Sequence, residues 1–442
     1  SATVEVPAGQ LQEGVNTLEL ASTGGEGDMS LVDRVVLTYP HRYEAENDGS
    51  KFTAGAGQPA TVRGFSSGAV RVLDVTDAAN VAEVQASVSG SDGNYAVTVI
   101  PGGTGERRLL AVTAARASRP AGVRAHVPTE MQTDPAGADM VMLSHGDFTA
   151  AVRPLKELQD AQGLTVAAID VQALYDESSF GDKSPYAMKA FLEKALGEWE
   201  RKPRYLLLVG DASFDPNNYL GWGDFDYLPT KLVDTAVSET ASDDWYGDFT
   251  GAGVPAFAVG RLPVRTADEA SAMVAKIIGY EKSEGGEWQR QALLVTDKDD
   301  LENPFATLAS GVKAEMPEGI AVTEINRASD GDAHEKLLER WQAGVGLVNY
   351  VGHGSFRIWA GELLNADQAA ALQNGALPFV ISMTCLNGYF QDVVQDGLGE
   401  ALMKSAGGAV GVWASSGLTG SGDQSVMNKA MVKALYSGMT VG

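Results

Sequence analysis

Two stretches near the end of the chain decide its fold. The first is Leu347–Ser355 (LVNYVGHGS), and the second is Phe379–Gly388 (FVISMTCLNG). Each begins as a continuous apolar run, which is typical of a strand buried on both faces. A segment with one helix separates them, and a strand–helix–strand unit predicts a right-handed crossover between parallel strands.

Each of these strands ends on a side chain that carries chemistry. The first ends on His353, which lies between two glycines, and the second ends on Cys385, the only cysteine in the chain. Parallel neighbours open their carboxyl ends on the same edge of a sheet, where ligands bind in open α/β folds. We therefore expect His353 and Cys385 to lie side by side at the mouth of one cleft.

Such a pair predicts nucleophilic catalysis by a thiolate, with the imidazole as the partner that protonates the leaving group. The Gly354 and Cys385 N–H groups are candidate oxyanion donors, each of which lowers a barrier by roughly 3–4 kcal/mol in other enzymes. Taken separately, a lone Cys is more often a small buried hydrophobe, and a His between glycines is more often a turn residue. The joint placement at consecutive strand ends favours the chemical interpretation.

The order of elements predicts three domains or subdomains. Residues 1–133 carry short strand-like runs such as Thr3–Val6, Val35–Thr38 and Tyr95–Ile100, separated by turn clusters, which indicates an all-β sandwich-like domain. From residue 134 onward, apolar strands alternate with helical segments, so we expect a mostly parallel sheet with helices on both faces. A break near Glu284–Gly286 divides this part into 134–283 and 284–442.

Composition excludes several classes of protein. The 442 residues carry a formal net charge of -25, which argues against binding nucleic acid or an anionic membrane surface. One Cys cannot form an internal disulfide, and no apolar run is long enough to span a bilayer. The sequence opens at Ser1 without a signal segment. We interpret it as a piece of a longer protein, whose targeting signals would lie outside it.

The motifs around His353 and Cys385 resemble those of the gingipain family of cysteine peptidases, which share the caspase-like fold. Further similar segments are Tyr205–Pro216, Ala241–Tyr246, Val259–Val264 and, nearer the start, Val32–Val35 and Tyr39–Ala45. The resemblance implies a Cys/His dyad in which Cys385 is the nucleophile and His353 the base. It also implies a protein or peptide substrate and an extracellular or cell-surface location in a bacterium. It says nothing of oligomeric state.

A third catalytic group is expected in the acidic text Val295–Asp300, which ends another strand. Asp297 or Asp299 could reach His353, and we favour Asp297; the alternative is a solvated loop that caps the following helix. Gingipains cut after Arg or Lys with an acid in the S1 pocket. In this sequence the corresponding segment is Glu302–Phe305, and no acid in it aligns with the acid of that pocket. The segment Val412–Gly417 is expected to form a pocket wall, and Trp413 is equally plausible as a core residue.

A second acidic region, residues 211–248, allows two interpretations. It is either an exposed acidic surface or a calcium site formed by clustered carboxylates, since hard cations prefer oxygen ligands. The candidate ligands are Asp211, Asp215, Asp243 and Asp244. The family resemblance favours the calcium site, because members of the family often carry structural calcium. No cofactor is expected for the chemistry itself.

The sequence therefore predicts a cysteine endopeptidase of caspase-like α/β architecture behind a β-rich N-terminal domain. Two alternatives remain open: a sortase-like transpeptidase of the same family, and an inactive surface or adhesion scaffold. Gly64–Gly68 (GFSSG) matches the serine-hydrolase pattern G-x-S-x-G, but that motif needs a helix after it, and strand-like text follows here. We expect a turn at this position.

Overall fold

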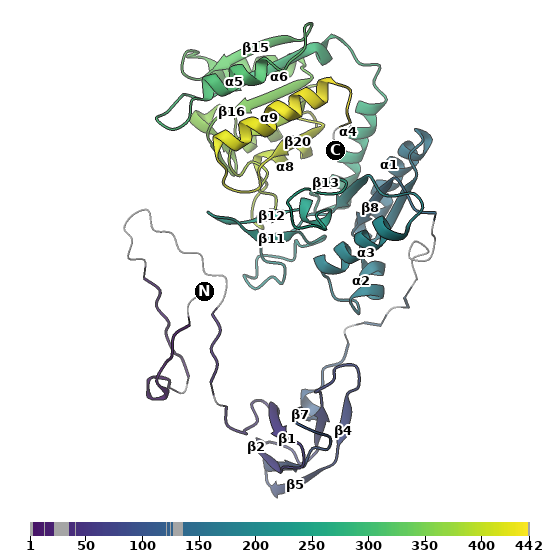
Figure 1. Cartoon of the computed structure of the whole chain (residues 1–442), viewed down its shortest axis with the longest axis vertical. Coiled ribbons are helices and arrows are strands. Elements are labelled where there is room, and N and C mark those ends of the chain that lie inside the picture. The colour runs from purple at the N-terminus through teal and green to yellow at the C-terminus, as the bar shows by residue number, and fades with distance from the viewer. Residues whose placement is uncertain are drawn as a thin grey trace. The chain divides into compact units, whose positions relative to one another are not determined.

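A computed structural model of the chain describes residues 3–12, 14–21, 35–39, 41–120, 122–123, 125–126 and 136–440. The chain forms two compact units, Ser1–Ala125 and His126–Gly442 (Figure 1). The boundary expected at residues 133 and 134 lies outside the described residues. Among the described residues, no helix is long and apolar enough to cross a membrane.

The first unit holds two antiparallel sheets, with strand orders β1-β7-β3-β4 and β2-β6-β5. Their bounds are β1 Gly49–Gly55, β2 Ala60–Phe65, β3 Val70–Asp74, β4 Ala82–Val84, β5 Ala86–Ser91, β6 Asn94–Val99 and β7 Glu106–Thr113. Buried side chains from both sheets, among them Phe65, Val97 and Leu109, form one core. Sharing a core across two sheets is what a sandwich requires.

Two of the strands expected near the start do not form. Thr3–Val6 and Val35–Thr38 are described as irregular, and their side chains are exposed. Among the described residues neither segment has a partner strand, and a strand needs one to satisfy its backbone. The turn cluster Ser22–Gly25 and residues 32–34 lie outside the described residues. Gly64 sits at a register shift in β2, and β3 follows, so GFSSG is a connection between strands.

The second unit begins with a four-stranded parallel sheet of order β13-β10-β8-β9. Its strands are β8 Met140–Ser144, β9 Val166–Asp170, β10 Tyr205–Val209 and β13 Ala258–Leu262, and a hairpin of β11 Lys231–Asp234 and β12 Glu239–Ser242 lies between the last two in sequence. One face packs on α1 Thr149–Ala161 and α4 Ala267–Glu281, and the other on α2 Val171–Ser178 and α3 Pro185–Glu198. Helices thus cover both faces, as the alternating pattern predicts.

A second parallel sheet has the order β15-β14-β16-β19-β20. Its strands are β14 Gln291–Thr296, β15 Ala321–Asn326, β16 Leu347–Val351, β19 Phe379–Met383 and β20 Gly411–Ala414, and a short hairpin of β17 Gly354–Ser355 and β18 Ile358–Trp359 follows β16. One face packs on α6 Ala333–Ala343, α7 Ala366–Ala370 and α8 Leu398–Lys404, and the other on α5 Phe305–Lys313 and α9 Ser421–Tyr436 (Figure 1). The expected α/β architecture behind an all-β domain is confirmed.

Candidate active site

The strands that carry His353 and Cys385 are direct neighbours. Parallel β16 and β19 pair from Leu347 with Phe379 to Val351 with Met383. His353 and Cys385 each follow that last pair by the same short step, so the two residues leave the sheet at the same edge and level. A Cβ atom on Gly354 would lie only 2.6 Å from the Thr384 hydroxyl, so the two segments are in contact beyond the sheet.

Glycine before His353 lets the chain turn at the strand end. A Cβ on Gly352 would lie 2.4 Å from the Asp297 Cβ and 2.5 Å from the Tyr350 hydroxyl, closer than real atoms approach. The turn is then held by hydrogen bonds to the His353 backbone. Its N–H donates to Asp297 Oδ2 at 3.1 Å, and its carbonyl accepts from the Tyr350 hydroxyl at 2.6 Å.

The His353 ring is fixed by a carboxylate and an aromatic ring. Nε2 lies 2.6 Å from Asp300 Oδ2, and the ring meets Phe305 edge-on at 4.9 Å between centroids. An ionised carboxylate only accepts hydrogen bonds, so Nε2 carries the proton in this contact. The side chain is 55% exposed, which leaves the rest of the imidazole open to a substrate.

Asp300, rather than Asp297 or Asp299, is the carboxylate that contacts the His353 ring. The hydrogen bond from His353 holds the pKa of Asp300 well below its usual range, and bonds from the Glu302 and Asn303 backbone N–H groups add to this. Asp299 accepts from the Ala306 N–H in the first turn of α5. Sequence reasoning missed Asp300, although an Asp three residues before Asn303-Pro304 is a frequent turn signal.

Asp297 acts on the main chain of the site. Its buried carboxylate accepts the His353 N–H on one oxygen and Arg327 Nε, at 2.6 Å, on the other. A buried charge needs such a partner, because an unpaired one costs several kcal/mol. A role for Asp297 in orienting the imidazole stays a prediction, since its contact is with the backbone rather than the ring.

Cys385 is engaged by the segment that precedes α9. The Thr419 N–H donates to Sγ at 3.4 Å, and Sγ lies 3.6 Å from the Thr419 carbonyl oxygen. Leu386, the next residue, has a φ of 60°, an unfavourable value for a side chain of this size. Within the described part of the chain, no hydrogen bond joins Sγ to the His353 ring.

The hydrogen-bond pattern bears on both candidate oxyanion donors. The His353 carbonyl accepts from Ala360 N–H, so the alternation of an antiparallel ladder turns the Gly354 N–H away from β18. The Cys385 N–H has no acceptor among the described residues. Thr384 precedes Cys385 in sequence, and its hydroxyl lies close to Gly354. This hydroxyl is buried without a hydrogen-bond partner among those same residues.

A cavity of about 510 Å³ adjoins the cysteine. Thr419 and Gln424 line it, and Thr419 is also the hydrogen-bond partner of Cys385. The remaining walls come from both sheets and include the whole run Val412–Ser416. The expected pocket wall is therefore where the sequence predicted it, with Trp413 facing the cavity rather than only the core.

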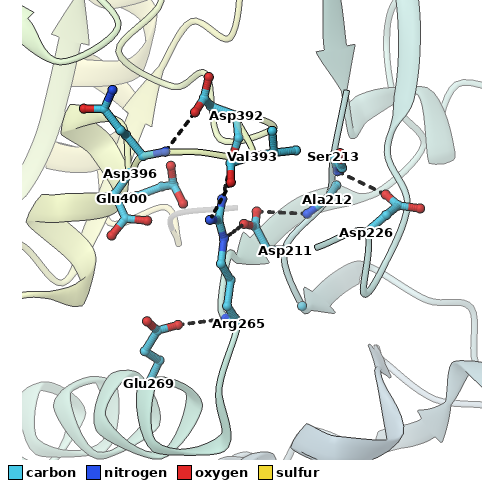
Figure 2. Close-up of polar contacts among 12 residues, drawn as sticks. Asp211, Ala212, Ser213, Asp226, Arg265, Glu269, Asp392, Val393, Asp396 and Glu400 are labelled. Carbon is cyan, nitrogen blue, oxygen red and sulfur yellow. Dashed lines mark hydrogen bonds and ion pairs between the residues drawn. The ribbon is translucent and has the colours of Figure 1, made fainter. Parts of the chain in front are cut away.

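The four residues expected to bind calcium are not brought together. Asp211 is fully buried and pairs with Arg265 Nε at 2.6 Å (Figure 2), while Asp243 pairs with Arg261 Nε at 2.7 Å. Asp215 accepts from the Tyr219 and Leu220 N–H groups, and Asp244 lines the cavity. Across residues 136–440 and the other described ranges, no three acidic, His or Cys side chains form a group that could hold a metal ion. These residues do not fit a calcium site.

Asp211 instead belongs to a buried charge network that joins the two sheets. Arg265 donates to the carbonyls of Asp392 and Val393, which lie in the segment after the cysteine (Figure 2). Burial raises the pKa of Asp211 to about 6, against the attraction of Arg265. Burial also raises the pKa of nearby Glu400 well above its usual range, and repulsion from Asp211 adds to this.

Comparison with known proteins relates the second unit to cysteine peptidases. Gingipain R2 of Porphyromonas gingivalis is 24% identical over 218 residues, which are 47% of this chain and 27% of that protein. Lys-gingipain of the same organism is 24% identical over 274 residues, 60% of this chain and 15% of that protein. The chain thus spans little more than a quarter of the length of the first of these curated relatives, and less of the second.

Solved structures show the same fold. A crystal structure of the Arg-specific cysteine proteinase gingipain R superposes with a TM-score of 0.56 at 18% identity, over 71% of each chain. A second protease structure gives a TM-score of 0.54 at 20% identity, over 69% of this chain and 66% of the other. A model of peptidase family C25 matches residues 133–442, well over half of the sequence. The chain therefore belongs to peptidase family C25, the gingipain-type cysteine peptidases.

Proposed function

We propose that this chain is a cysteine endopeptidase in which Cys385 is the nucleophile, His353 the general acid and base, and Asp300 the carboxylate that orients His353. The observation that carries the proposal is the placement of His353 and Cys385 at one level beyond paired strands β16 and β19. The contact between Gly354 and Thr384 keeps the two segments together beyond the sheet. Membership in a cysteine peptidase family supports the same assignment.

The reaction proceeds through a thioester. The Cys385 sulfur attacks the carbonyl carbon of the scissile peptide bond, and the proton of the thiol passes to His353. The Gly354 and Cys385 N–H groups stabilise the oxyanion that forms. The C–N bond then breaks, and His353 gives the proton to the leaving amine. Water, deprotonated by His353, attacks the thioester, releases the acid product and restores the thiol.

Substrate binding completes this geometry. In this structure Sγ accepts a hydrogen bond from Thr419, and the His353 ring is hydrogen-bonded to Asp300. Catalytic hydrogen bonds often tighten only in the substrate complex.

The cavity beside Thr419 is the proposed pocket for the substrate side chain before the scissile bond. Its volume of about 510 Å³ admits a long side chain, and Met383, Val412 and Trp413 give it apolar walls. Asp243 in the same cavity is neutralised by Arg261. The proposed substrates are proteins and peptides, and the proposed location, from the family resemblance, is extracellular or on the cell surface. No step requires calcium.

The test is hydrolysis of a diverse peptide library by the wild type and by the Cys385→Ala and His353→Ala variants, with Val426→Ala, an exposed position on α9, as the control. We expect turnover by the wild type and the control only. Turnover that survives in either dyad variant would contradict the assignment. Products that incorporate an added amine would indicate transpeptidation instead. A wild type that neither hydrolyses peptides nor reacts with a thiol-directed epoxide would favour an inactive scaffold.

A further inference from the structure

Two hydrogen-bond chains run from the first turn of α9 toward the two reactive side chains. The first leads to the imidazole. The Ser421 hydroxyl donates to Asn303 Oδ1 at 2.7 Å, and Asn303 Nδ2 donates to both Asp300 oxygens, at 3.0 and 3.1 Å. Asp300 in turn holds His353 Nε2 at 2.6 Å. A shift of Ser421 is thereby passed to the ring.

The second chain leads to the sulfur. Gln424 Nε2 donates to the Thr384 carbonyl at 3.0 Å and to the Thr419 hydroxyl. These two residues flank Cys385, one as the preceding residue in sequence and the other as the donor to Sγ at 3.4 Å. The amide of Gln424 therefore fixes the backbone before the cysteine and the hydrogen-bond partner of its sulfur with one group.

Helix α9 is itself fixed to the strand that carries the histidine. Asn428 and Asn349 of β16 exchange two hydrogen bonds, at 2.6 and 2.9 Å, and both side chains are fully buried. A reciprocal amide pair in a dry interior allows little movement, because breaking it leaves unpaired polar groups. The helix thus provides one rigid reference from which both chains start.

We infer that Gln424 and Asn303 are positioning residues that set Cys385 and His353 relative to each other through the first turn of α9. The inference rests on the proposed peptidase function, and extends it to residues that do not touch the reacting atoms, although Gln424 also lines the cavity beside Thr419. Neither amide is needed to build the core. Both side chains are only partly buried, whereas α9 is anchored by Asn428 and Val432. Their loss should therefore change geometry more than stability.

The first experiment compares Gln424→Ala, Gln424→Glu and Asn303→Ala with Val426→Ala, with kcat expressed per active site titrated by a thiol-directed inhibitor. We expect kcat to fall roughly 10- to 100-fold in the three variants, because small misplacement of catalytic groups slows the chemical step. KM should stay within about twofold in Asn303→Ala, whose side chain lies outside the lining of the proposed substrate pocket. Gln424→Glu keeps the shape of the side chain, but its carboxylate cannot donate the hydrogen bonds that Nε2 makes. It should fail as Gln424→Ala does, and full activity in it would overturn the role given to Nε2.

The pH–rate profile separates the two chains. Asn303→Ala frees Asp300 and should move the acid limb toward lower pH, because a less fixed carboxylate stabilises the imidazolium less. Gln424→Ala should leave that limb in place. Unchanged kcat per titrated site in both variants, with only a lower melting temperature, would show a structural role and overturn the inference.

Alkylation of Cys385 by iodoacetamide tests the sulfur chain without any peptide substrate. Loss of the Gln424 amide loosens Thr419, whose N–H donates to Sγ. An N–H donor stabilises the thiolate, which is the form that reacts with iodoacetamide. We therefore expect alkylation of Gln424→Ala to be about 10-fold slower than that of the wild type and of Val426→Ala. Equal rates would contradict the inference. If the wild type cleaves no peptide but the variant is still alkylated more slowly, the proposed function fails while the positioning of the sulfur stands.

Discussion

The two parallel sheets of the second unit carry similar residues at their carboxyl edges and use them differently. In the first sheet, β8 ends on His145, whose Nδ1 accepts from the Asp147 N–H and whose ring packs on Tyr227. In the second, β16 ends near His353, whose ring contacts Asp300, and β16 pairs with the strand that precedes Cys385. A strand-end histidine is thus not sufficient for a site. What differs is the neighbouring strand, because the single cysteine of the sequence follows β19, which pairs with β16.

The same contrast applies to a buried Asp–Arg pair that each sheet carries at this edge. Asp211 follows β10 and pairs with Arg265, while Asp297 follows β14 and pairs with Arg327, both at 2.6 Å. Arg265 continues to the backbone of the segment after the cysteine, and Asp297 continues to the His353 N–H. One pair braces a loop, and the other holds the backbone of His353, the proposed general base. The same kind of ion pair at the same edge therefore supports a loop in the first sheet and fixes the His353 backbone in the second.

The largest expected effect separates the two histidines. His353→Ala should lower kcat/KM by at least about 10³-fold, because both proton transfers lose their carrier. His145→Ala should leave kcat/KM within twofold of the wild type. Steady-state hydrolysis of a peptide cleaved by the wild type measures both. An equal loss in the two variants would remove the distinction between the sheets.

A smaller effect separates their carboxylate partners. Asp300→Asn should lower kcat about 100-fold, because the neutral amide no longer stabilises the imidazolium. Asp147 lies 3.6 Å from the His145 ring, and Asp147→Asn provides the matched control with unchanged kcat. If both variants keep wild-type kcat, Asp300 does not orient His353. That outcome would return Asp297 as the remaining candidate.

The two Asp–Arg pairs should differ in what their loss affects. Asp211→Asn and Asp297→Asn should each reduce the free energy of unfolding by about 3 kcal/mol, because each leaves a partly buried arginine without its charge partner. Only Asp297→Asn should also lower kcat per titrated site, through the His353 backbone. Urea unfolding and active-site titration measure the two quantities. Loss of kcat in both variants would mean that Arg265 also positions the site.

The smallest expected effect concerns Lys276 of α4, whose Nζ donates to the Met403, Ser405 and Gly407 carbonyls around the end of α8. Burial lowers the pKa of Lys276 to about 8 from 10.5. Between these values the unfolded chain binds more protons than the folded one, so this group makes stability rise with pH. From pH 7.5 to 9.5 the wild type should gain about 1 kcal/mol relative to Lys276→Met, after allowance for partial exposure. Parallel urea titrations would contradict this if the difference stayed constant.

The sequence was most informative where the chain is most buried. Continuous apolar runs predicted β16 and β19, and their strand ends predicted the level shared by His353 and Cys385. The expected strands Thr3–Val6 and Val35–Thr38 fail because composition cannot show whether a partner strand exists. Individual polar contacts could not be predicted from the sequence either. Whether Asp297, Asp299 or Asp300 faces a ring depends on a loop geometry that single residues decide.

The acidic region 211–248 shows the same limit for charge. Carboxylates close in sequence suggested a shared cation, but arginines far away in the chain, Arg261 and Arg265, neutralise two of them. Sequence patterns reveal which charges exist, and only the fold reveals which charges meet. The helix α9, whose amides we infer to position the dyad, likewise gave no local signal of its role.

The reach of Arg265 and Lys276 has a consequence for how this unit unfolds. Both cations start beside the first sheet and end on backbone carbonyls between Asp392 and Gly407, in the half that holds Cys385. Separating the two halves would break the hydrogen bonds that Arg265 and Lys276 donate to these carbonyls. The two sheets should therefore melt as one cooperative block. A cut between them at residue 284 would yield two fragments that fold only when mixed.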